Sequence, residues 1–319
     1  YLNTETRPWI SQPETLRRAA VNAFGFGGIN AHVLLEEAPG AAPTPRHWAE
    51  ELVVLSAPTS ALLAARARDL ADAAARHAGL SLSDLAYSAA ATAGDGPARM
   101  AVVASSRDDL IDKLGKACER LDSGKTSLKM RSGVFAEAKP LSGKLAFLFP
   151  GEGAQYQGKL QAKLTMLPEA REWFDFWDGL FPDRAFPPSA SVFPPPSGVD
   201  PELGKILHDR LFGLELGSES VFIAAQALLA VTERLGLSPD AVVGHSSGEH
   251  SALAAAGVLG KTGTAADRIE FAKRIQSLNN LYQVMDASGG IAGGALLTVG
   301  AVSRTVILDM VAKDPAIHL

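Results

Sequence analysis

The chain has 319 residues, of which 47% are hydrophobic and 20% charged, as expected of a folded globular protein with one to three domains. Its net charge is −5, with 35 acidic and 30 basic residues, which gives no electrostatic case for nucleic-acid binding. The single cysteine, Cys118, rules out an intrachain disulfide, and no apolar run approaches the length of a membrane span. These features indicate a cytoplasmic protein. Cys118 lies in a helical pattern, and we interpret it as a packing residue rather than a nucleophile.

The N-terminal residues have neither the basic start nor the apolar core of a signal peptide. The chain begins with Tyr1 and ends at Leu319, from which we expect a piece of a longer polypeptide. Residues 19–37 predict two strands joined by a glycine-rich turn, too short to bury their own apolar side chains. The turn lacks the Lys-Ser/Thr pair of a phosphate loop, and His32 is interpreted as structural.

Residues 39–46 have the composition of a linker, and residues 47–140 predict a small α+β unit. Ser60 is expected to cap its first helix, and Ser83 or Asp84 its second. We see no site chemistry here, and an independent binding module is the alternative to a spacer. The expected elements are strands at 51–56, 99–104 and 132–136 and helices at 60–78, near 84 and at 108–121.

From residue 144 the pattern changes to that of an α/β fold. Residues 145–149 are a fully apolar strand, as a central parallel strand should be. The sequence Pro-Gly-Glu-Gly-Ala-Gln follows, and its two glycines expose N–H groups at the sheet edge where such folds bind ligands. A dinucleotide loop would need another glycine at position 156, where Tyr156 stands. The loop is better suited to supply a backbone donor for a developing oxyanion.

The rest of the chain is predicted to be mostly helical, with an aromatic group (Trp173, Phe174, Phe176 and Trp177) that we interpret as core. A strand near the end suggests the start of a second small subdomain that the chain does not finish. The expected elements are helices within 160–215 and at 220–235, 265–282 and 303–312, and a strand at 293–300.

A second strand-to-helix turn carries the strongest chemical signal. Residues 241–243 are apolar and predict a buried strand, and an alanine-rich helix follows. Between them, Gly244 and Gly248 flank Ser246 in the Gly-x-Ser-x-Gly pattern of a nucleophile elbow, where a Cβ at either glycine would clash. The plainer alternative is an ordinary βα turn that contains a serine.

The two glycine-containing loops together predict a catalytic site. If both strands lie in one parallel sheet, both loops open at the same edge. Ser246 then faces two backbone donors, the N–H groups of Glu152 and Ser247, which is the arrangement needed for acyl transfer.

These motifs resemble known families. Residues 24–33, Phe-Gly-Phe-Gly-Gly-Ile-Asn-Ala-His-Val, resemble the end of a polyketide β-ketoacyl synthase, whose catalytic residues lie upstream of this chain. The pair Phe-Pro-Gly-x-Gly-x-Gln (149–155) and Gly-His-Ser-x-Gly-Glu (244–249) resembles the malonyl-CoA:acyl carrier protein transacylases over most of 144–319. Residues 150–156 and 172–175 look closest to iterative synthases of the enediyne and polyunsaturated fatty acid kind. Glu152 departs from the family, which usually has Gln there.

The resemblance implies a domain order. Residues 1–38 would be the C-terminal tail of a ketosynthase, 39–140 a ketosynthase–acyltransferase linker, 141–288 the large acyltransferase subdomain and 289–319 the incomplete start of the small one. The implied fold class is α/β: a hydrolase-like large acyltransferase subdomain with a parallel sheet and the start of a small ferredoxin-like subdomain, preceded by a small α+β linker domain.

The implied activity is ping-pong loading of a malonyl-type unit from acyl-CoA, through an acyl-Ser246, onto the phosphopantetheine thiol of an acyl carrier protein. The adjacent ketosynthase domain is a further expected partner, and neither a bound cofactor nor a metal is expected. Alternatives are a serine hydrolase or thioesterase of the α/β-hydrolase type, with water as acceptor, and an inactive scaffold fragment.

The family's catalytic base is a histidine well downstream of the elbow, so we expect it beyond the end of this chain. His245 should point away from the nucleophile, His250 is poorly placed, and His208 and His318 match nothing. For the malonyl carboxylate the resemblance implies an arginine on the helix after the elbow.

Arg274 is the best match by position for that arginine. Arg268 and Lys273 are alternatives because residues 260–263 look like an insertion. The plainer alternative is that these basic side chains form a solvent-exposed face of the helix and bind no substrate. The residue after the nucleophile, Ser247, does not indicate whether a malonyl or a methylmalonyl unit would be selected.

Overall fold

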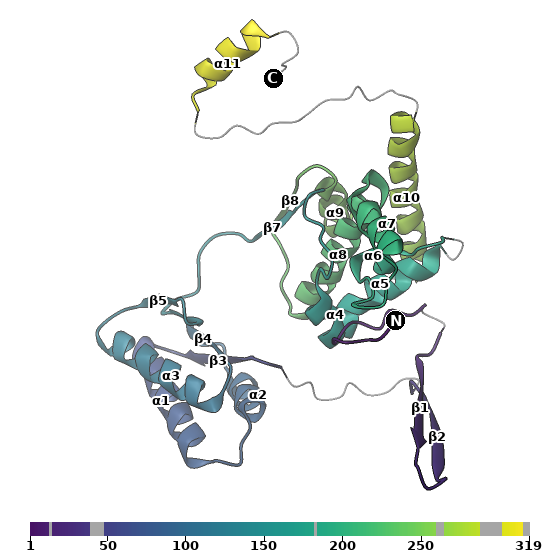
Figure 1. Ribbon diagram of the computed structural model, residues 1–319. Coiled ribbons are helices and arrows are strands. Elements are labelled where there is room, and N and C mark those ends of the chain that lie inside the picture. The colour runs from purple at the N-terminus through teal and green to yellow at the C-terminus, as the bar shows by residue number, and fades with distance from the viewer. Residues whose placement is uncertain (13–14, 39–47, 182–183, 260–264, 288–301, 315–319) are drawn as a thin grey trace.

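The computed structural model describes residues 1–12, 15–38, 48–181, 184–259, 265–287 and 302–314 (Figure 1). Near the N-terminus, β1 (Arg18–Phe24) and β2 (Asn30–Glu36) pair antiparallel with Phe24 opposite Asn30, which confirms the two predicted strands and their turn. Every residue of both strands is exposed. The ribbon therefore leaves its apolar side chains uncovered, as expected for a segment too short to form a core.

The next unit is an antiparallel sheet with strand order β3-β4-β6-β5, covered by helices (Figure 1). Its core includes Val53, Met100, Leu110 and Leu114, all almost completely buried. Cys118 is buried there too, as expected, and burial raises the pKa of its thiol. The elements are β3 (Glu51–Ala57), α1 (Ser60–Arg76), α2 (Leu82–Thr92), β4 (Ala98–Ala104), α3 (Arg107–Asp122), β5 (Ser127–Met130) and β6 (Val134–Glu137).

The predicted helix caps of this unit are wrong by one to three residues. Thr59, not Ser60, caps α1: its side chain accepts a hydrogen bond from the N–H of Leu62 at 3.3 Å. Ser81 caps α2 in a reciprocal pair with Asp84, each side chain accepting from the other's N–H, at 3.1 and 2.9 Å. Asp84 is thus the third helical residue rather than the cap, because a Ser-x-x-Asp pair satisfies two free N–H groups together. Strand β5 was not predicted.

The third unit is mostly helical around one short parallel strand pair (Figure 1). β7 and β8 are parallel, with Phe149 opposite Gly244, so both glycine loops leave the sheet at the same edge, as expected. The aromatic group is core, with Phe174 and Trp177 fully buried. The elements are β7 (Ala146–Phe149), α4 (Gln161–Met166), α5 (Pro168–Leu180), α6 (Pro188–Val192), α7 (Pro201–Phe212), α8 (Leu214–Arg234), β8 (Ala241–Gly244), α9 (Gly248–Ala255) and α10 (Ala265–Ala287).

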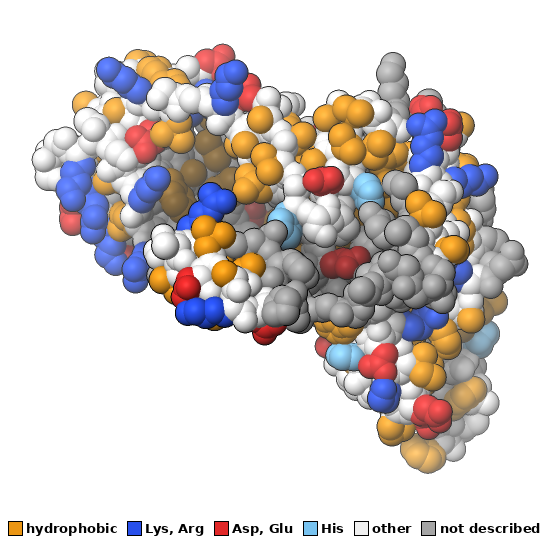
Figure 2. Space-filling model, turned by 90° about the horizontal axis from the view of Figure 1, so that it is seen from above, with side chains coloured by type: hydrophobic (Ala, Val, Ile, Leu, Met, Phe, Trp, Pro, Cys, Tyr) orange, Lys and Arg blue, Asp and Glu red, His pale blue; other side chains and the backbone are white. Residues whose placement is uncertain are grey.

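The predicted burial of β7 and β8 is wrong. Leu148 is 75% exposed and Val243 is 55% exposed. The physical reason is that, within the described residues, each strand pairs only with the other, so their outer edges and part of their faces are open. Hydrophobic side chains reach the surface in several places on the face seen in Figure 2.

The N-terminal segment lies against the third unit. Asp175 on α5 accepts hydrogen bonds from the N–H of Ser11 and from Arg17, both at 2.8 Å. Arg17 also pairs with Glu37, just after β2, at 2.9 Å. One guanidinium thus links the N-terminal ribbon to the helical unit.

Two further predictions concern parts of the chain that the structure does not describe: the linker at 39–46 and the strand at 293–300. The helix α11 (Arg304–Lys313) follows, capped by Ser303. Among the described residues no single helix is long and apolar enough to cross a bilayer. α7 and the part of α8 from Leu216 reach that length and hydropathy only as a pair bent by 72°.

Candidate active site

The turn between β8 and α9 has the geometry of a nucleophile elbow. Ser246 has a left-handed backbone with φ of 53°, and its side chain is exposed. A non-glycine residue in this region costs roughly 1–2 kcal/mol, and such strain is concentrated at functional sites. The carbonyls of His245 and Ser246 accept from the N–H groups of Gly248 and Glu249, at 2.9 and 3.0 Å. The turn therefore enters the helix immediately, with the serine at its apex.

Three glycines allow the backbones to approach closely. A Cβ at Gly244 would lie 2.5 Å from the backbone of Glu249, and one at Gly248 would lie 2.3 Å from the carbonyl oxygen of Phe149. A Cβ at Gly151 would lie 2.5 Å from the carbonyl oxygen of His245. All three clashes are with backbone, which cannot rotate away, so each position requires glycine.

The same contact brings the two loops together. The ideal Cβ position of Gly151 is 2.8 Å from the Cβ of Ser246 and 3.2 Å from the nitrogen of Ser247. The N–H of His245 donates to the carbonyl of Phe149 at 3.0 Å, which fixes the register between the loops.

The chemistry of this edge depends on groups that are left free. In the described part of the chain, no group accepts a hydrogen bond from the backbone N–H of Glu152 or of Ser247, and Ser246 Oγ has no partner. Ser247 is the N-cap of α9, where the helix dipole favours negative charge. An exposed hydroxyl beside two free amides is suited to attack a carbonyl and bind the oxyanion that forms.

Among the described residues, no histidine is hydrogen-bonded to Ser246. His245 is exposed next to it, and His250 is half-buried in the first turn of α9, where burial lowers its pKa despite the neighbouring Glu249. His208 stacks on Phe212. None of these three is hydrogen-bonded to Ser246 in the described residues, and His318 lies outside them.

The predicted carboxylate-binding residue lies on α10, but it is engaged locally. Arg274 is 57% exposed, donates to the carbonyl of Leu259 at 3.2 Å and pairs with Glu270 one helical turn away. It makes no hydrogen bond or ion pair with an elbow residue in the described chain. Of the alternatives, Arg268 stacks over the ring of Trp173 at 5.5 Å, and Lys273 is exposed.

Sequence reasoning missed two side chains that hold the loop after β7. Gln155 is 8% exposed, and its Oε1 accepts from the N–H of Gly153 at 2.7 Å. Lys159 donates to the carbonyl of Ala154, and burial lowers its pKa. The signal for Gln155 was its place at the end of the Gly-x-Gly-x-Gln motif.

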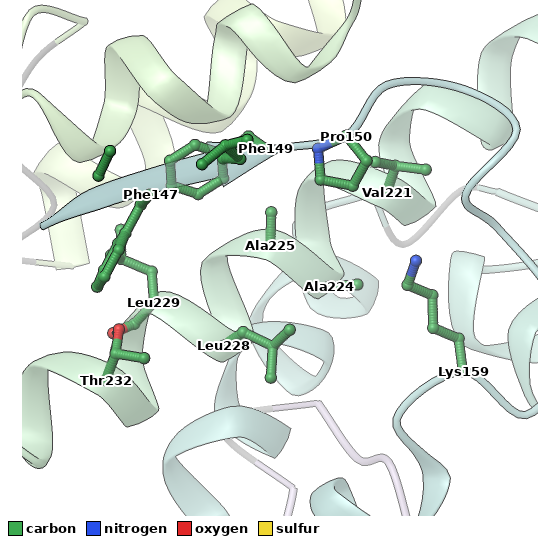
Figure 3. Close-up of a pocket in the computed structure, with 12 residues that line it drawn as sticks. Phe147, Phe149, Pro150, Lys159, Val221, Ala224, Ala225, Leu228, Leu229 and Thr232 are labelled. Carbon is green, nitrogen blue, oxygen red and sulfur yellow. The ribbon is translucent and has the colours of Figure 1, made fainter. Parts of the chain in front are cut away.

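A cleft of about 270 Å³ lies between β7 and α8 (Figure 3). Apolar side chains line it, including Phe147 and Phe149 from the strand and Leu228 from the helix, while Lys159 lies at one end. Ser246 is not among the lining residues. The cleft is therefore separate from the nucleophile, and we assign no ligand to it.

Comparison with known proteins places these features in context. Residues 1–103 match the family described as the ketoacyl-synthetase C-terminal extension. The chain is 33% identical over 265 residues to a phenolphthiocerol/phthiocerol polyketide synthase of Mycobacterium tuberculosis, an alignment that covers 79% of this chain. It spans only 16% of that relative's length.

Two solved structures share the fold. The acyl transferase domain of ZmaA aligns with 76% of this chain and 55% of its own, with a TM-score of 0.57 and 19% identity. The acyl transferase domain of SpnD, in complex with 2-(pent-4-yn-1-yl)malonyl, aligns with 75% of this chain and 50% of its own, with a TM-score of 0.53 and 23% identity.

The fold is therefore that of an acyltransferase domain, which confirms the predicted α/β class with a hydrolase-like large subdomain after an α+β unit. The predicted start of a small ferredoxin-like subdomain lies mostly outside the described residues. The chain is similar to polyketide synthases over most of its own length, and its first 103 residues match the ketoacyl-synthetase C-terminal extension. The domain boundaries drawn from the sequence stay predictions.

Proposed function

We propose that this protein transfers a malonyl-type acyl group from coenzyme A to an acyl carrier protein through an ester on Ser246. One observation carries the proposal: Ser246 is exposed at a strained turn and lies against Gly151, and the amides of the next residue in each loop, Glu152 and Ser247, have no acceptor among the described residues. A serine that only shaped the turn would give no reason for the second loop to approach so closely.

In the first half-reaction, Ser246 Oγ attacks the thioester carbon and its proton passes to a base. The C–O bond forms, and the carbonyl oxygen becomes an oxyanion that accepts hydrogen bonds from the two amides. The C–S bond then breaks and coenzyme A leaves as the thiol with a proton returned by the base. Removing one such donor typically costs about 3 kcal/mol of transition-state stabilisation.

In the second half-reaction, the phosphopantetheine thiol of the carrier protein attacks the acyl-serine ester, and Ser246 recovers its proton. The base is proposed to be a histidine outside the described residues, as in the family that the motifs resemble. The adjacent ketosynthase would consume the loaded unit.

The malonyl class is supported by analogy and by charge. SpnD's acyl transferase domain was solved with a malonyl derivative, and it shares this fold. Arg274 is our candidate for the carboxylate, since a guanidinium binds a carboxylate bidentately once it leaves its present partner Glu270. The similarity to enediyne-type iterative synthases also stays a proposal, resting on residues 150–156 and 172–175.

The test is to incubate the natural polypeptide that contains this sequence with malonyl-CoA and measure its mass. We expect a malonyl adduct on the peptide with Ser246, which disappears on adding a carrier protein and is absent in S246A. Rapid release of free malonate without carrier protein would instead show a hydrolase. Absence of any adduct in the wild type would contradict the proposal and favour a scaffold role.

A further inference from the structure

The loop that carries the Glu152 amide has little stiffness of its own. Glycine stands on both sides of Glu152, and Gly153 has a φ of 97°. Glycines rotate freely, so the peptide groups of such a loop can turn over at small cost. Contacts with side chains and with neighbouring backbone must therefore decide where the Glu152 N–H points.

Two contacts fix the loop on either side of that amide. On one side, Gly151 is wedged against the backbone of His245 and the side chain of Ser246. On the other, the N–H of Gly153 donates to the buried Oε1 of Gln155 at 2.7 Å. The second bond turns the Gly153 N–H inward and leaves that of Glu152 free.

Gln155 is itself held by a helix of the core. A Cβ at Gly217, near the start of α8, would lie 3.1 Å from Gln155 Nε2 and 3.4 Å from the carbonyl oxygen of Leu211. Glycine inside a helix costs about 1 kcal/mol relative to alanine, so its presence here calls for a reason. The amide of Gln155 occupies the space that a side chain at position 217 would take.

Lys159 binds the same loop, but at a different point. Its ammonium donates to the carbonyl of Ala154 and lies 5.4 Å from the ring centre of Tyr156. This contact anchors the far end of the loop and leaves the orientation of the peptides at 152 and 153 undetermined. Orientation is therefore the task of Gln155.

We infer that Gln155 is a positioning residue for the oxyanion site: through the N–H of Gly153 it holds the Glu152–Gly153 peptide, and so limits rotation of the adjoining Gly151–Glu152 peptide, whose N–H is presented to the thioester oxygen. The inference rests on the proposed function. Because the amide matters most when charge develops on that oxygen, loss of Gln155 should lower kcat and leave KM for malonyl-CoA almost unchanged.

The test uses Gln155→Met, which keeps the length and removes the acceptor, in the natural polypeptide. The rate of Ser246 acylation by malonyl-CoA is followed by rapid quench and mass measurement. We expect kcat to fall at least about tenfold, with KM within about twofold. Hydrogen exchange at the Gly153 amide should be faster in the variant. The matched control is Gln157→Met, an exposed glutamine two residues further along, which should change neither value.

A second variant separates positioning from stability. Gly217→Ala leaves the loop sequence intact and favours the helix, but it crowds Gln155 Nε2. It should lower kcat several-fold with no fall in thermal stability. If Gln155→Met does not fold, this variant still tests the positioning role of Gln155.

Two outcomes would overturn the inference, and they are distinguishable. Acylation at the wild-type rate in both Gln155→Met and Gly217→Ala would remove the role of Gln155 and leave the proposed function standing. A wild-type protein that forms no acyl-serine would overturn the proposed function, and this role with it.

Discussion

At the scale of single residues, the site depends on where hydrogen bonds are missing. Most backbone amides of a folded protein are paired, because an unpaired buried donor is costly. Here the amides of Glu152 and Ser247 have no acceptor among the described residues, and both lie beside an exposed serine with strained backbone. Free donors that a fold holds in place can bind an oxyanion without reorganising, which is why such sites stabilise transition states strongly.

Arg274 gives a prediction at this scale. Arg274→Ala should lower transfer of malonyl groups at least about tenfold, and transfer of acetyl groups much less, because only malonate has a carboxylate for the guanidinium to bind. Lys273→Ala, at an exposed cation on the same helix, is the matched control and should alter neither rate. The measurement is kcat/KM for the two thioesters. Equal losses for both would show that Arg274 supports the fold rather than the substrate.

At the scale of elements, the contact between α5 and α6 contains a half-buried acid. Asp178 accepts from the N–H of Ser189 at 3.2 Å. Burial raises the pKa of Asp178 from 3.8 to about 6, although this hydrogen bond and Arg184 act in the opposite direction. The charged carboxylate is therefore disfavoured in the folded state.

A pH-dependent stability follows for Asp178. Between pH of about 4 and 6 the folded protein keeps a proton that the unfolded chain releases, so this group lowers stability as pH rises through that range. Asp178→Asn can still accept from Ser189 and carries no charge. We expect the free energy of unfolding of the variant, relative to that of the wild type, to increase by about 2 kcal/mol as the pH rises from 4 to 7. The measurement is urea unfolding at several pH values. A difference between the two proteins that does not vary with pH would refute this.

The sequence predicts elements well where periodicity and caps agree, as in β3, β4 and α3. It misses β5, because its four residues alternate between polar and apolar side chains over too short a run to be recognised. It misplaces the cap of α2, because Ser81, Ser83 and Asp84 all have capping side chains and only the folded turn selects one. It also predicts burial for β7 and β8 from their apolar residues, whereas burial depends on neighbouring strands.

The same limit applies to the site. Glycine spacing identified both loops, since close backbone approach restricts residue choice at Gly151, Gly244 and Gly248. The motif marked Gln155 but gave it no role, because its packing against Gly217 of α8 brings together residues distant in the sequence and forms only in the folded protein.

At the scale of the whole molecule, the N-terminal ribbon and the helical unit that carries the elbow are linked through Arg17. Its side chain is 16% exposed, and that of its partner Asp175 is 12% exposed. Burial alone would lower the pKa of Arg17, but the charges and hydrogen bonds of Asp175 and Glu37 raise it. The pair therefore favours its charged state and ties the N-terminal ribbon to α5.

This link can be measured with a double-mutant cycle of Arg17→Met and Asp175→Asn. We expect a coupling free energy of about 1–2 kcal/mol, because both groups are largely desolvated and directly bonded. The exposed pair Lys205 and Asp209 is the control, and its coupling should be about 0.5 kcal/mol or less. Coupling for Arg17 no greater than in this control would mean that the ribbon is held by other contacts.

The central claim is that amides from two strand ends bind one oxygen above Ser246. The most direct measurement is a crystal structure of the natural polypeptide with an aryl phosphonate bonded to Ser246 Oγ, since its phosphonyl oxygen mimics the oxyanion. We predict that oxygen about 3 Å from the nitrogens of both Glu152 and Ser247. A phosphonyl oxygen that points into solvent, beyond hydrogen-bond distance of either nitrogen, would contradict the account.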